Sequence, residues 1–459
     1  MMIQSLDKIQ HVFFIGIAGT GMSALAQYLN GIGKNVSGSD RYFSKGEAED
    51  IKIKLEADGI TCFPQDGSGI HEGIELVIVS TAVEDTVPEV QQAKTFAIPI
   101  IKRSELLSLI CKTKRTIAVG GTSGKSTTSA MIFAILEEAG MGASIISGAG
   151  LTCLIKEGRI GNAKVGKGEW LVIEADESDG SIVQYEAEIG LLLNIDKDHK
   201  EIDVLLDIFQ TFKNKSRYFS VNRSHPLAAR LSKESAWDFT IDENMEAGYK
   251  ASAFDQRGLD IRFEINKQPF LLHSVGKHNM ENVLAAVAIT SKVGVELSVA
   301  ARAIASYEGI YRRHQVWGTK GSVTLIDDYA HNPVKCAASI RACQPAAKKL
   351  IAWFQPHGYA PTKFLRQDFG EEISTAIREG DEVWMSEIFY AGGTTTKDIS
   401  AADLIGDLKA KGVNAFFVED RNQLVETMRP HFSEGTVLLL MGARDPSLEK
   451  FAAQVWSEL

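Results

Sequence analysis

A short glycine-rich segment, Gly121-Thr-Ser-Gly-Lys-Ser126, carries the clearest chemistry in the sequence. It joins an apolar run typical of a strand to a run typical of a helix, a context in which backbone N–H groups hold phosphate oxygens. Lys125 would reach the terminal phosphates and the Ser126 hydroxyl would hold magnesium. The standard phosphate-loop pattern needs glycine where this chain has Val119, so a shortened loop is expected. The residues predicted to bind ATP here are Gly121, Thr122, Ser123, Gly124, Lys125, Ser126 and Thr127.

Polar side chains at the ends of the next two strand-like runs could complete a magnesium site. Glu174 and Asp176 lie at the end of the run 170–175, and His199 follows the run 191–194. The carboxyl ends of parallel strands face the ligand crevice, so these side chains would lie beside the phosphate loop. Taken alone, the residues also permit an acidic solvated turn and a structural histidine.

A second glycine turn, Gly16-Ile-Ala-Gly-Thr-Gly21, also joins a strand-like run to a helix-like run. Asp40 follows at a distance typical of the acidic residue that meets a ribose in dinucleotide-binding folds. The glycine order is G-x-x-G-x-G rather than G-x-G-x-x-G, which weakens that reading. Beside an ATP loop, the turn favours a substrate that carries a diphosphate. Purely structural glycines are the alternative.

Alternating strand-like and helix-like segments surround these motifs and predict parallel sheets. Residues 236–272 alternate instead in the manner of antiparallel strands. Strands are expected at 11–17, 75–80, 116–119, 170–175, 191–194, 323–326, 350–354, 382–385, 415–418 and 437–441, and helices at 22–33, 47–59, 88–95, 126–138 and 280–292. The predicted α/β domains are 1–112, 113–316 and 317–459.

The composition agrees with several soluble domains. A chain of 459 residues with 44% hydrophobic residues suggests about three domains. The net charge of -10 argues against nucleic-acid binding, and no apolar run is long enough for membrane insertion. Five cysteines without a C-x-x-C pair predict reduced, buried thiols in a cytoplasmic protein. The sequence leaves the oligomeric state undetermined.

Several longer segments occur in a fixed order over nearly the whole chain. They are HVFFIGIAGTGMSALA, VIVSTAV, IPIIKRSELL, GTSGKSTT, EADESD, NIDKDH, GKHNMENVLAA, YRR, DDYAHNP and FQPH. In this order they resemble the Mur ligases of bacterial cell-wall synthesis, most closely the branches that attach alanine or an intact peptide to UDP-N-acetylmuramate. The resemblance implies a Rossmann-like UDP-binding first domain, a central P-loop ATPase-like domain with a mainly parallel sheet, and a Rossmann-like third domain for the acceptor.

The resemblance also implies roles for individual residues. The UDP sugar would meet Gly16, Gly19, Thr20, Gly21, Asp40, Ser80 and Thr81. Magnesium would be held by Ser126, Glu174 and His199, and further nucleotide contacts would come from Asn279, Asn282, Arg313 and Asp328. The residues expected near the reacting groups are Lys125, Glu174, His199, His331 and His357.

The implied reaction is ATP-dependent amide ligation. The lactyl carboxylate of UDP-N-acetylmuramate attacks the γ-phosphate, and an amino acid, with L-alanine favoured, displaces phosphate from the acyl phosphate. Catalysis would rest on charge neutralisation and alignment by Lys125 and Mg2+, without a protein nucleophile. Closure of the domains would gate turnover.

The sequence departs from the alanine-adding pattern where the incoming amine should bind. Those enzymes typically follow FQPH with two arginines, whereas this chain continues Gly358-Tyr-Ala-Pro361. A buried substrate carboxylate without a donor is costly, and Lys363 or Arg366 could serve only with a different geometry. The acceptor could therefore differ, and an intact peptide is the alternative.

Three further positions differ from the pattern. Ser123 stands where alanine-adding enzymes typically have histidine, and Gly442-Ala-Arg-Asp-Pro446 replaces Gly-Ala-Gly-Asn-Ile. Lys215 falls near a site where sister Mur ligases carry a carbamoylated lysine, although a solvated helix lysine is the favoured reading.

Other functions stay open at this point. A ligase of this fold could act on another acid, such as a folate or a poly-amino-acid primer, but the UDP-type first domain argues against it. A nicotinamide oxidoreductase would leave the ATP loop unexplained. A catalytically silent module that binds UDP-sugar and ATP as a sensor is disfavoured by the intact Lys125, Glu174 and His199.

Overall fold

The computed structural model describes residues 3, 5–80, 83–178, 180–196, 200–390, 392 and 396–459. These residues form two compact units. The first comprises Met1–Ser252, Glu264–Phe270 and Glu281–Tyr311, and the second comprises Ala253–Phe263, Leu271–Met280 and Arg312–Leu459.

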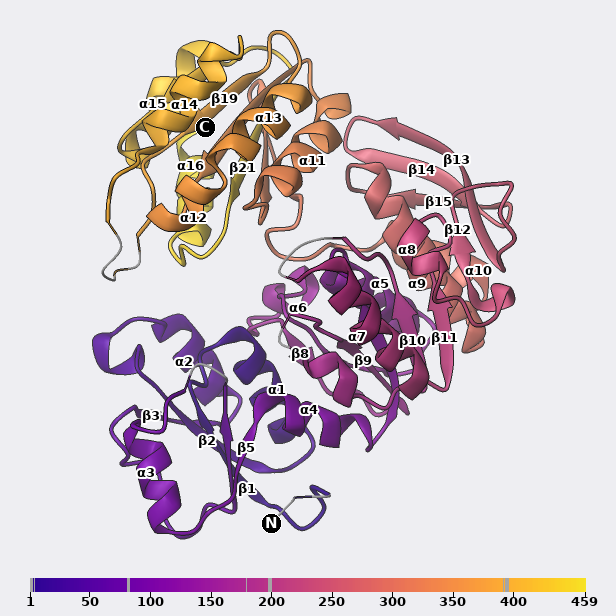
Figure 1. Ribbon diagram of the computed structural model, residues 1–459, viewed down its shortest axis with the longest axis vertical. Helices are drawn as coiled ribbons and strands as arrows, with labels where there is room; N and C mark the ends of the chain where they lie inside the picture. Colours follow the sequence, from indigo (N-terminus) through magenta and orange to yellow (C-terminus); the bar gives the residue numbers. More distant parts are fainter. Residues whose placement is uncertain are drawn as a thin grey trace. The chain divides into compact units, whose positions relative to one another are not determined.

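The N-terminal part of the first unit is a five-stranded parallel sheet in the order β3-β2-β1-β4-β5. Alternate residues of β1 face opposite layers: Phe14 packs in the core with α1 and α4, whereas Phe13 packs with α3. Figure 1 shows these helices beside the sheet. The elements are β1 (His11–Ile15), α1 (Thr20–Gly31), β2 (Asn35–Asp40), α2 (Glu49–Ala57), β3 (Thr61–Pro64), β4 (Leu76–Val79), α3 (Pro88–Thr95), β5 (Ile100–Lys102) and α4 (Arg103–Cys111).

The central sheet of the first unit has the order β11-β10-β6-β9-β7-β8. All neighbours are parallel except β8, which runs antiparallel to β7. The phosphate-loop segment therefore leaves a strand, β6, with a parallel neighbour on each side. The elements are β6 (Arg115–Gly120), α5 (Lys125–Glu138), β7 (Ser144–Ile146), α6 (Thr152–Lys156), β8 (Ala163–Lys164), β9 (Trp170–Glu174), β10 (Ile189–Leu192), α7 (Ile202–Lys215), β11 (Tyr218–Val221) and α8 (Pro226–Ala229).

A smaller sheet follows in the order β12-β13-β14-β15, and the division between the two units runs through its strands. The predicted antiparallel pattern is wrong for its first pair, because β12 and β13 are parallel, with Phe239 opposite Tyr249. The elements are β12 (Phe239–Thr240), β13 (Tyr249–Arg257), β14 (Asp260–Ile265), β15 (Gln268–Leu272), α9 (Lys277–Lys292) and α10 (Leu297–Ala305).

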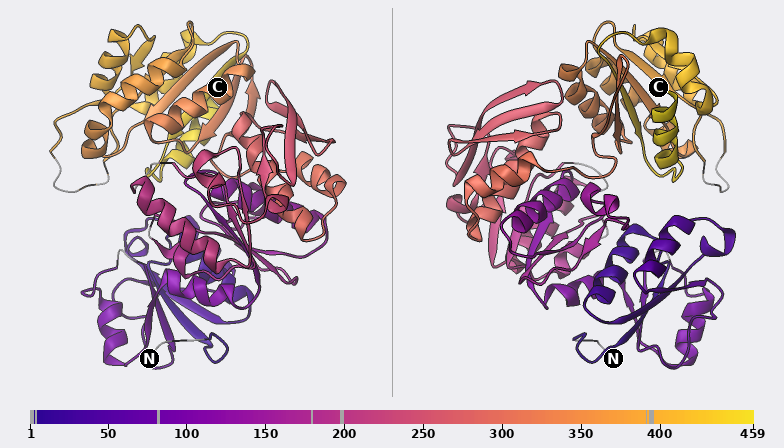
Figure 2. Two further views of the ribbon diagram at one scale, coloured as in Figure 1. Left: turned by 45° about the vertical axis from the view of Figure 1, so that its right-hand side comes forward. Right: turned by 180° about the vertical axis from the view of Figure 1, so that it is seen from behind.

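The C-terminal sheet has the order β16-β17-β21-β18-β19-β20 and is parallel except for β16. Helices α11, α13 and α14 contribute to the core on one face, and α15 and α16 to the core on the other (Figure 2). The elements are β16 (Gln315–Lys320), β17 (Val323–Asp328), α11 (Pro333–Cys343), β18 (Lys349–Gln355), α12 (Tyr359–Phe364), α13 (Arg366–Ala376), β19 (Glu382–Met385), α14 (Ala401–Ala410), β20 (Ala415–Phe417), α15 (Leu424–Met428), β21 (Thr436–Gly442) and α16 (Leu448–Glu458).

The α/β fold class with mainly parallel sheets is confirmed, while the predicted boundaries at 112 and 316 stay predictions. In the part of the chain that the structure describes, no helix is long and apolar enough to cross a membrane. The five cysteines are free thiols, but the prediction that all are buried is wrong, because Cys153 is exposed and Cys62 only partly buried.

Candidate active site

The loop between β6 and α5 is built by its glycines. Gly121 and Gly124 have φ angles of 138° and 86°, which L side chains rarely adopt. A side chain at Gly124 would also meet Oδ1 of Asn282, since a Cβ there would lie 2.7 Å from that atom. The two glycines let the backbone turn sharply into the first turn of α5, where Lys125 and Ser126 stand. The predicted strand, turn and helix are thus present.

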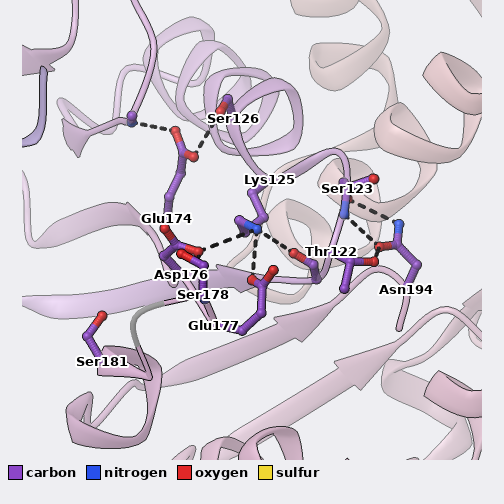
Figure 3. Close-up of polar contacts among 12 residues, drawn as sticks. Thr122, Ser123, Lys125, Ser126, Glu174, Asp176, Glu177, Ser178, Ser181 and Asn194 are labelled. Carbon is purple, nitrogen blue, oxygen red and sulfur yellow. Dashed lines mark hydrogen bonds and ion pairs between the residues drawn. The ribbon is translucent and has the colours of Figure 1, made fainter. Parts of the chain in front are cut away.

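Lys125 is held inside this loop by two partners. Its ammonium donates to the Gly121 carbonyl at 2.6 Å and to a carboxylate oxygen of Glu177 at 2.8 Å, while Asp176 lies 3.9 Å away (Figure 3). Burial raises the pKa of Glu177, and the nearby Lys125 ammonium opposes that shift. Glu177 was not among the predicted site residues, although it lies in the acidic segment 174–179. A cation so placed can meet a phosphate group that competes with Glu177.

Ser126 and Glu174, two of the three predicted magnesium ligands, are hydrogen-bonded to each other. The Ser126 hydroxyl donates to Glu174 at 2.8 Å, and the other carboxylate oxygen accepts from Ser147 at 2.7 Å and from the Gly148 N–H at 2.6 Å. Hard oxygen donors at the end of a phosphate loop suit Mg2+. Among the described residues no three His, Cys, Asp or Glu side chains gather into a group that could hold a metal. Mg2+ often needs only one or two protein carboxylates besides phosphate and water, so the pair fits it.

Asn194 organises the other side of the loop and was also missed. It follows β10, and its Oδ1 accepts from Thr122 Oγ1 at 2.9 Å and from the Ser123 N–H at 2.8 Å, while its Nδ2 donates to the Ser123 carbonyl at 3.1 Å. Thr122 donates further to Asp196 at 3.3 Å. The usable signal was a polar residue directly after an apolar strand that neighbours β6.

The remaining residues predicted near ATP do not all lie at the phosphate loop. Oδ1 of Asn282 accepts from Thr128 in α5 at 3.2 Å, so this side chain lies at the phosphate loop. Asn279 belongs to the second unit, where its amide donates to Ser274 and to the Val275 carbonyl. His199 lies outside the described residues, so its predicted role as a metal ligand stays a prediction.

The first glycine turn is held by its own acidic residue. Asp40 is buried, and its carboxylate accepts from the Ala18 and Tyr42 N–H groups at 2.9 and 3.0 Å. The Arg103 side chain packs directly against Gly21 near the start of α1. Sequence reasoning missed this arginine. Gly16, with φ of 79°, Gly19, Thr20 and Ser80 are described, and Thr81 is not.

In the second unit, the predicted histidines follow the two strands that flank β21. His331 comes after β17 and His357 after β18, both of which pair with β21, and the two rings lie 6.0 Å apart. Burial, together with the charge of Arg444, lowers the pKa of His357 to about 4. Burial also lowers the pKa of His331. Both imidazoles are therefore neutral near pH 7.

Arg313 and Asp328 lie in the same unit. The Arg313 guanidinium is stacked over Tyr329 at 4.8 Å, and Asp328 is buried and accepts from the His314 N–H at 3.1 Å. Nearby Arg312 forms a buried pair with Asp327 at 3.0 Å. Their predicted nucleotide contacts stay predictions.

Lys215 lies far from the phosphate loop within the first unit. It is exposed and borders a surface depression of about 1010 Å³ that includes Arg115, the first residue of β6. The phosphate loop leaves the opposite end of that strand. This position favours the solvated lysine over a carbamoylated magnesium ligand.

Comparison with known proteins gives matches along most of the chain. Three family domains match: "Mur ligase family, catalytic domain" at 11–115, "Mur ligase middle domain" at 119–290 and "Mur ligase, glutamate ligase domain" at 312–444. UDP-N-acetylmuramate–L-alanine ligases of Anaeromyxobacter dehalogenans and Pelotomaculum thermopropionicum are 30% and 32% identical, over 95% and 96% of both chains.

Solved structures are also similar. The UDP-N-acetylmuramate–alanine ligase MurC of Thermotoga maritima matches with a TM-score of 0.80 and 25% identity, over 98% of this chain and 100% of that one. A murein peptide ligase of Psychrobacter arcticus shares the fold, with a TM-score of 0.65 and 19% identity over 98% of each chain.

Proposed function

Because the chain belongs to the Mur ligase family, a family of ATP-dependent ligases, we propose that it joins an amino acid to the lactyl carboxylate of UDP-N-acetylmuramate. The products would be the amide, ADP and phosphate. L-alanine is the first candidate acceptor, because full-length relatives at 30–32% identity are ligases of that amino acid. The observation that carries the proposal is the phosphate loop, with Lys125 and Ser126 beside Glu177 and Glu174.

The nucleotide would bind through groups already gathered at the loop. Lys125 would exchange its contact with Glu177 for the terminal phosphates, and Ser126 and Glu174 would hold Mg2+. When bound, Mg2+ supplies neutralisation of phosphate charge. Asn282 lies against Gly124, which supports a role at the nucleotide, and we assign Asn279, Arg313 and Asp328 to it by family position only.

The chemistry needs no protein nucleophile. A carboxylate oxygen of the sugar bonds to the γ-phosphorus as the bond to ADP breaks, which gives an acyl phosphate. The amine nitrogen then bonds to the acyl carbon, the carbon–oxygen bond breaks, and phosphate leaves while the amine loses a proton to solvent. Lys125 opposes the repulsion between carboxylate and phosphate. The neutral rings of His331 and His357 can accept hydrogen bonds from the incoming amine.

The UDP sugar would bind at the first glycine turn. Gly16, Gly19, Thr20 and Gly21 present backbone at the start of α1, an arrangement that favours phosphate binding. Arg103 against Gly21 adds a cation suited to a diphosphate. Asp40, Ser80 and Thr81 complete the assignment by family position. We place the reaction in the cytoplasm, where ATP is available and thiols stay reduced.

One observation favours a second acceptor. The two arginines that alanine-adding enzymes typically carry after FQPH are absent, so an intact peptide, as in murein recycling, is the alternative amine.

Phosphate release tests the proposal. Purified protein, ATP, Mg2+ and UDP-N-acetylmuramate are incubated with a panel of amino acids and short peptides, with omission of the sugar as the control. Stimulation by L-alanine supports the first candidate, and stimulation by peptides alone supports the second. No stimulation by any amine would reject ligation onto this sugar and would favour a silent nucleotide-binding module.

A further inference from the structure

The carboxyl edge of the C-terminal sheet carries three polar groups on three adjacent strands. Strand β21 lies between β17 and β18, with Met441 opposite Asp328 and Gly442 opposite Gln355. His331 follows β17, His357 follows β18, and Arg444 follows β21 within two residues. The three side chains therefore leave the same edge of one sheet.

Arg444 stands on a backbone turn that disfavours an ordinary side chain. Its φ angle is 59°, and the Asp445 N–H donates across it to the Ala443 carbonyl at 2.8 Å. A three-residue turn with positive φ at its centre is rare and strained, and non-glycine residues persist in such turns where the surroundings fix them. Glycine would adopt this turn without strain, so an arginine here calls for a reason beyond the backbone.

The surroundings do fix the turn. Asp445 is buried, and its carboxylate pairs with Arg421 at 2.5 Å and accepts from Ser447 Oγ at 2.5 Å and from the Ser447 N–H at 2.9 Å. Arg421 in turn lies over the Phe451 ring of α16 at 5.1 Å. This clamp holds the residue after Arg444 in place and so presents the Arg444 side chain at the sheet edge.

The Arg444 guanidinium is exposed and, among the described residues, forms no hydrogen bond or ion pair. Its charge nevertheless reaches the histidines, since it helps to lower the pKa of both His331 and His357. Nδ1 of His357 is buried and has no hydrogen-bond partner within the described part of the chain. A cation and an unpartnered nitrogen thus remain at one edge, where a ligand could satisfy both.

Three cations that follow His357 in the chain already contact other side chains. Lys363 pairs with Asp398 at 2.5 Å, and Arg366 makes two hydrogen bonds to Asp407, at 2.6 and 2.9 Å. The Lys397 ammonium lies over the ring of Tyr390 at 5.4 Å. Neither of the two substitutes expected from sequence is therefore free to receive a substrate anion.

We propose that Arg444 receives the carboxylate of the incoming amino acid, in place of the arginines that are absent after His357. This inference rests on the proposed ligase function and selects, among its acceptors, a free amino acid whose carboxylate lies near the attacking nitrogen. Arginine matches a carboxylate with two parallel hydrogen bonds, which fixes the direction of the amine as well as its affinity. Arg444 is thus a specificity residue and takes no part in bond making.

The test compares an acceptor that has a carboxylate with one that lacks it. Phosphate release is measured for wild type, Arg444→Gly and Arg444→Lys with the best amino acid of the panel and with its amide, which lacks the carboxylate. Lys363→Ala is the matched control, since it removes another cation of the second unit, one that already pairs with Asp398. Glycine suits the positive φ, so Arg444→Gly should keep the thermal midpoint of wild type.

We expect Arg444→Gly to raise KM for the amino acid about 10- to 100-fold, as loss of a charged hydrogen bond predicts, with KM for the amide and for ATP unchanged. Arg444→Lys should recover part of the affinity, and Lys363→Ala should match wild type. The inference is overturned if KM rises equally for the amino acid and its amide, if KM rises for ATP instead, or if no KM rises. Each of these results leaves the ligase function intact. Wild type that releases no phosphate with any amine rejects both.

Discussion

The phosphate loop and the carboxyl edge of the C-terminal sheet differ in how their polar groups are satisfied. At the loop, Lys125, Ser126 and Thr122 each have a protein partner, from Glu177, Glu174 and Asn194 respectively. At the edge, Arg444 stands in a strained turn without an ion pair among the described residues, and His357 has an unpartnered nitrogen. The loop has the features of an ATP site that the whole family shares. The edge, in contrast, is where this chain lacks the arginines that alanine-adding enzymes typically carry.

Removal of the loop cation should have the largest effect. Lys125→Ala should lower phosphate release by about 10²- to 10³-fold, because the repulsion between carboxylate and phosphate is no longer offset. Lys156→Ala, which breaks only the exposed ion pair with Glu308, is the control and should match wild type. Near-normal turnover of Lys125→Ala would mean that the loop does not activate the carboxylate.

The support of the loop should matter less than the cation itself. Asn194→Ala removes three hydrogen bonds to Thr122 and Ser123, so the loop should lose its fixed shape. A rise of about tenfold in KM for ATP is expected, which corresponds to roughly 1–2 kcal/mol for lost hydrogen bonds. Kinetics at varied ATP with the sugar saturating would reveal it. If KM for ATP stays unchanged, the loop keeps its shape without Asn194.

The sequence predicted the loop better than the edge for a physical reason. Strand, glycine turn, lysine and helix are adjacent in the chain, so their spacing alone defines the phosphate site. Glu177 and Asn194 reach the loop through strand order, which the sequence does not state. The role proposed for Arg444 could not be inferred from sequence at all. Its φ angle, the clamp on Asp445 and the pairing of Lys363 with Asp398 all depend on contacts between distant segments.

The predicted fold shows the same limit. Strand and helix positions were confirmed because apolar periodicity is local, as at residues 350–354, which fall within β18. The parallel pairing of β12 with β13 was missed because alternation does not reveal strand direction. The exposed position of Cys153 was missed because residue type predicts burial only on average.

The titration of His357 tests, without turnover, whether the charge of Arg444 reaches this histidine. Its pKa of about 4 lies below the ordinary 6.5, so its contribution to stability is present above pH 6.5 and is lost as the pH falls toward 4. Arg444→Gly removes a positive charge and should raise the pKa of His357, which makes the acid loss of stability smaller. Ring signals followed by NMR between pH 4 and 7 give the pKa. A pKa that does not move would place Arg444 away from the histidines.

Lys215 should give the smallest effect. It is exposed and borders the end of β6 opposite the phosphate loop, so Lys215→Ala should change phosphate release by less than about twofold, as for most surface substitutions. Turnover is measured with and without added bicarbonate. A large loss of phosphate release in Lys215→Ala, or dependence of the wild-type rate on bicarbonate, would support carbamoylation of Lys215.

Transfer of an oxygen isotope shows whether ATP activates a substrate carboxylate. UDP-N-acetylmuramate labelled with 18O in its lactyl carboxylate is turned over with ATP, Mg2+ and the best amine, and the released phosphate is analysed by mass spectrometry. Acyl phosphate formation predicts that each phosphate carries one oxygen from the carboxylate, and that the amide product retains the other. Phosphate without label would show that water attacks ATP and would exclude an acyl phosphate.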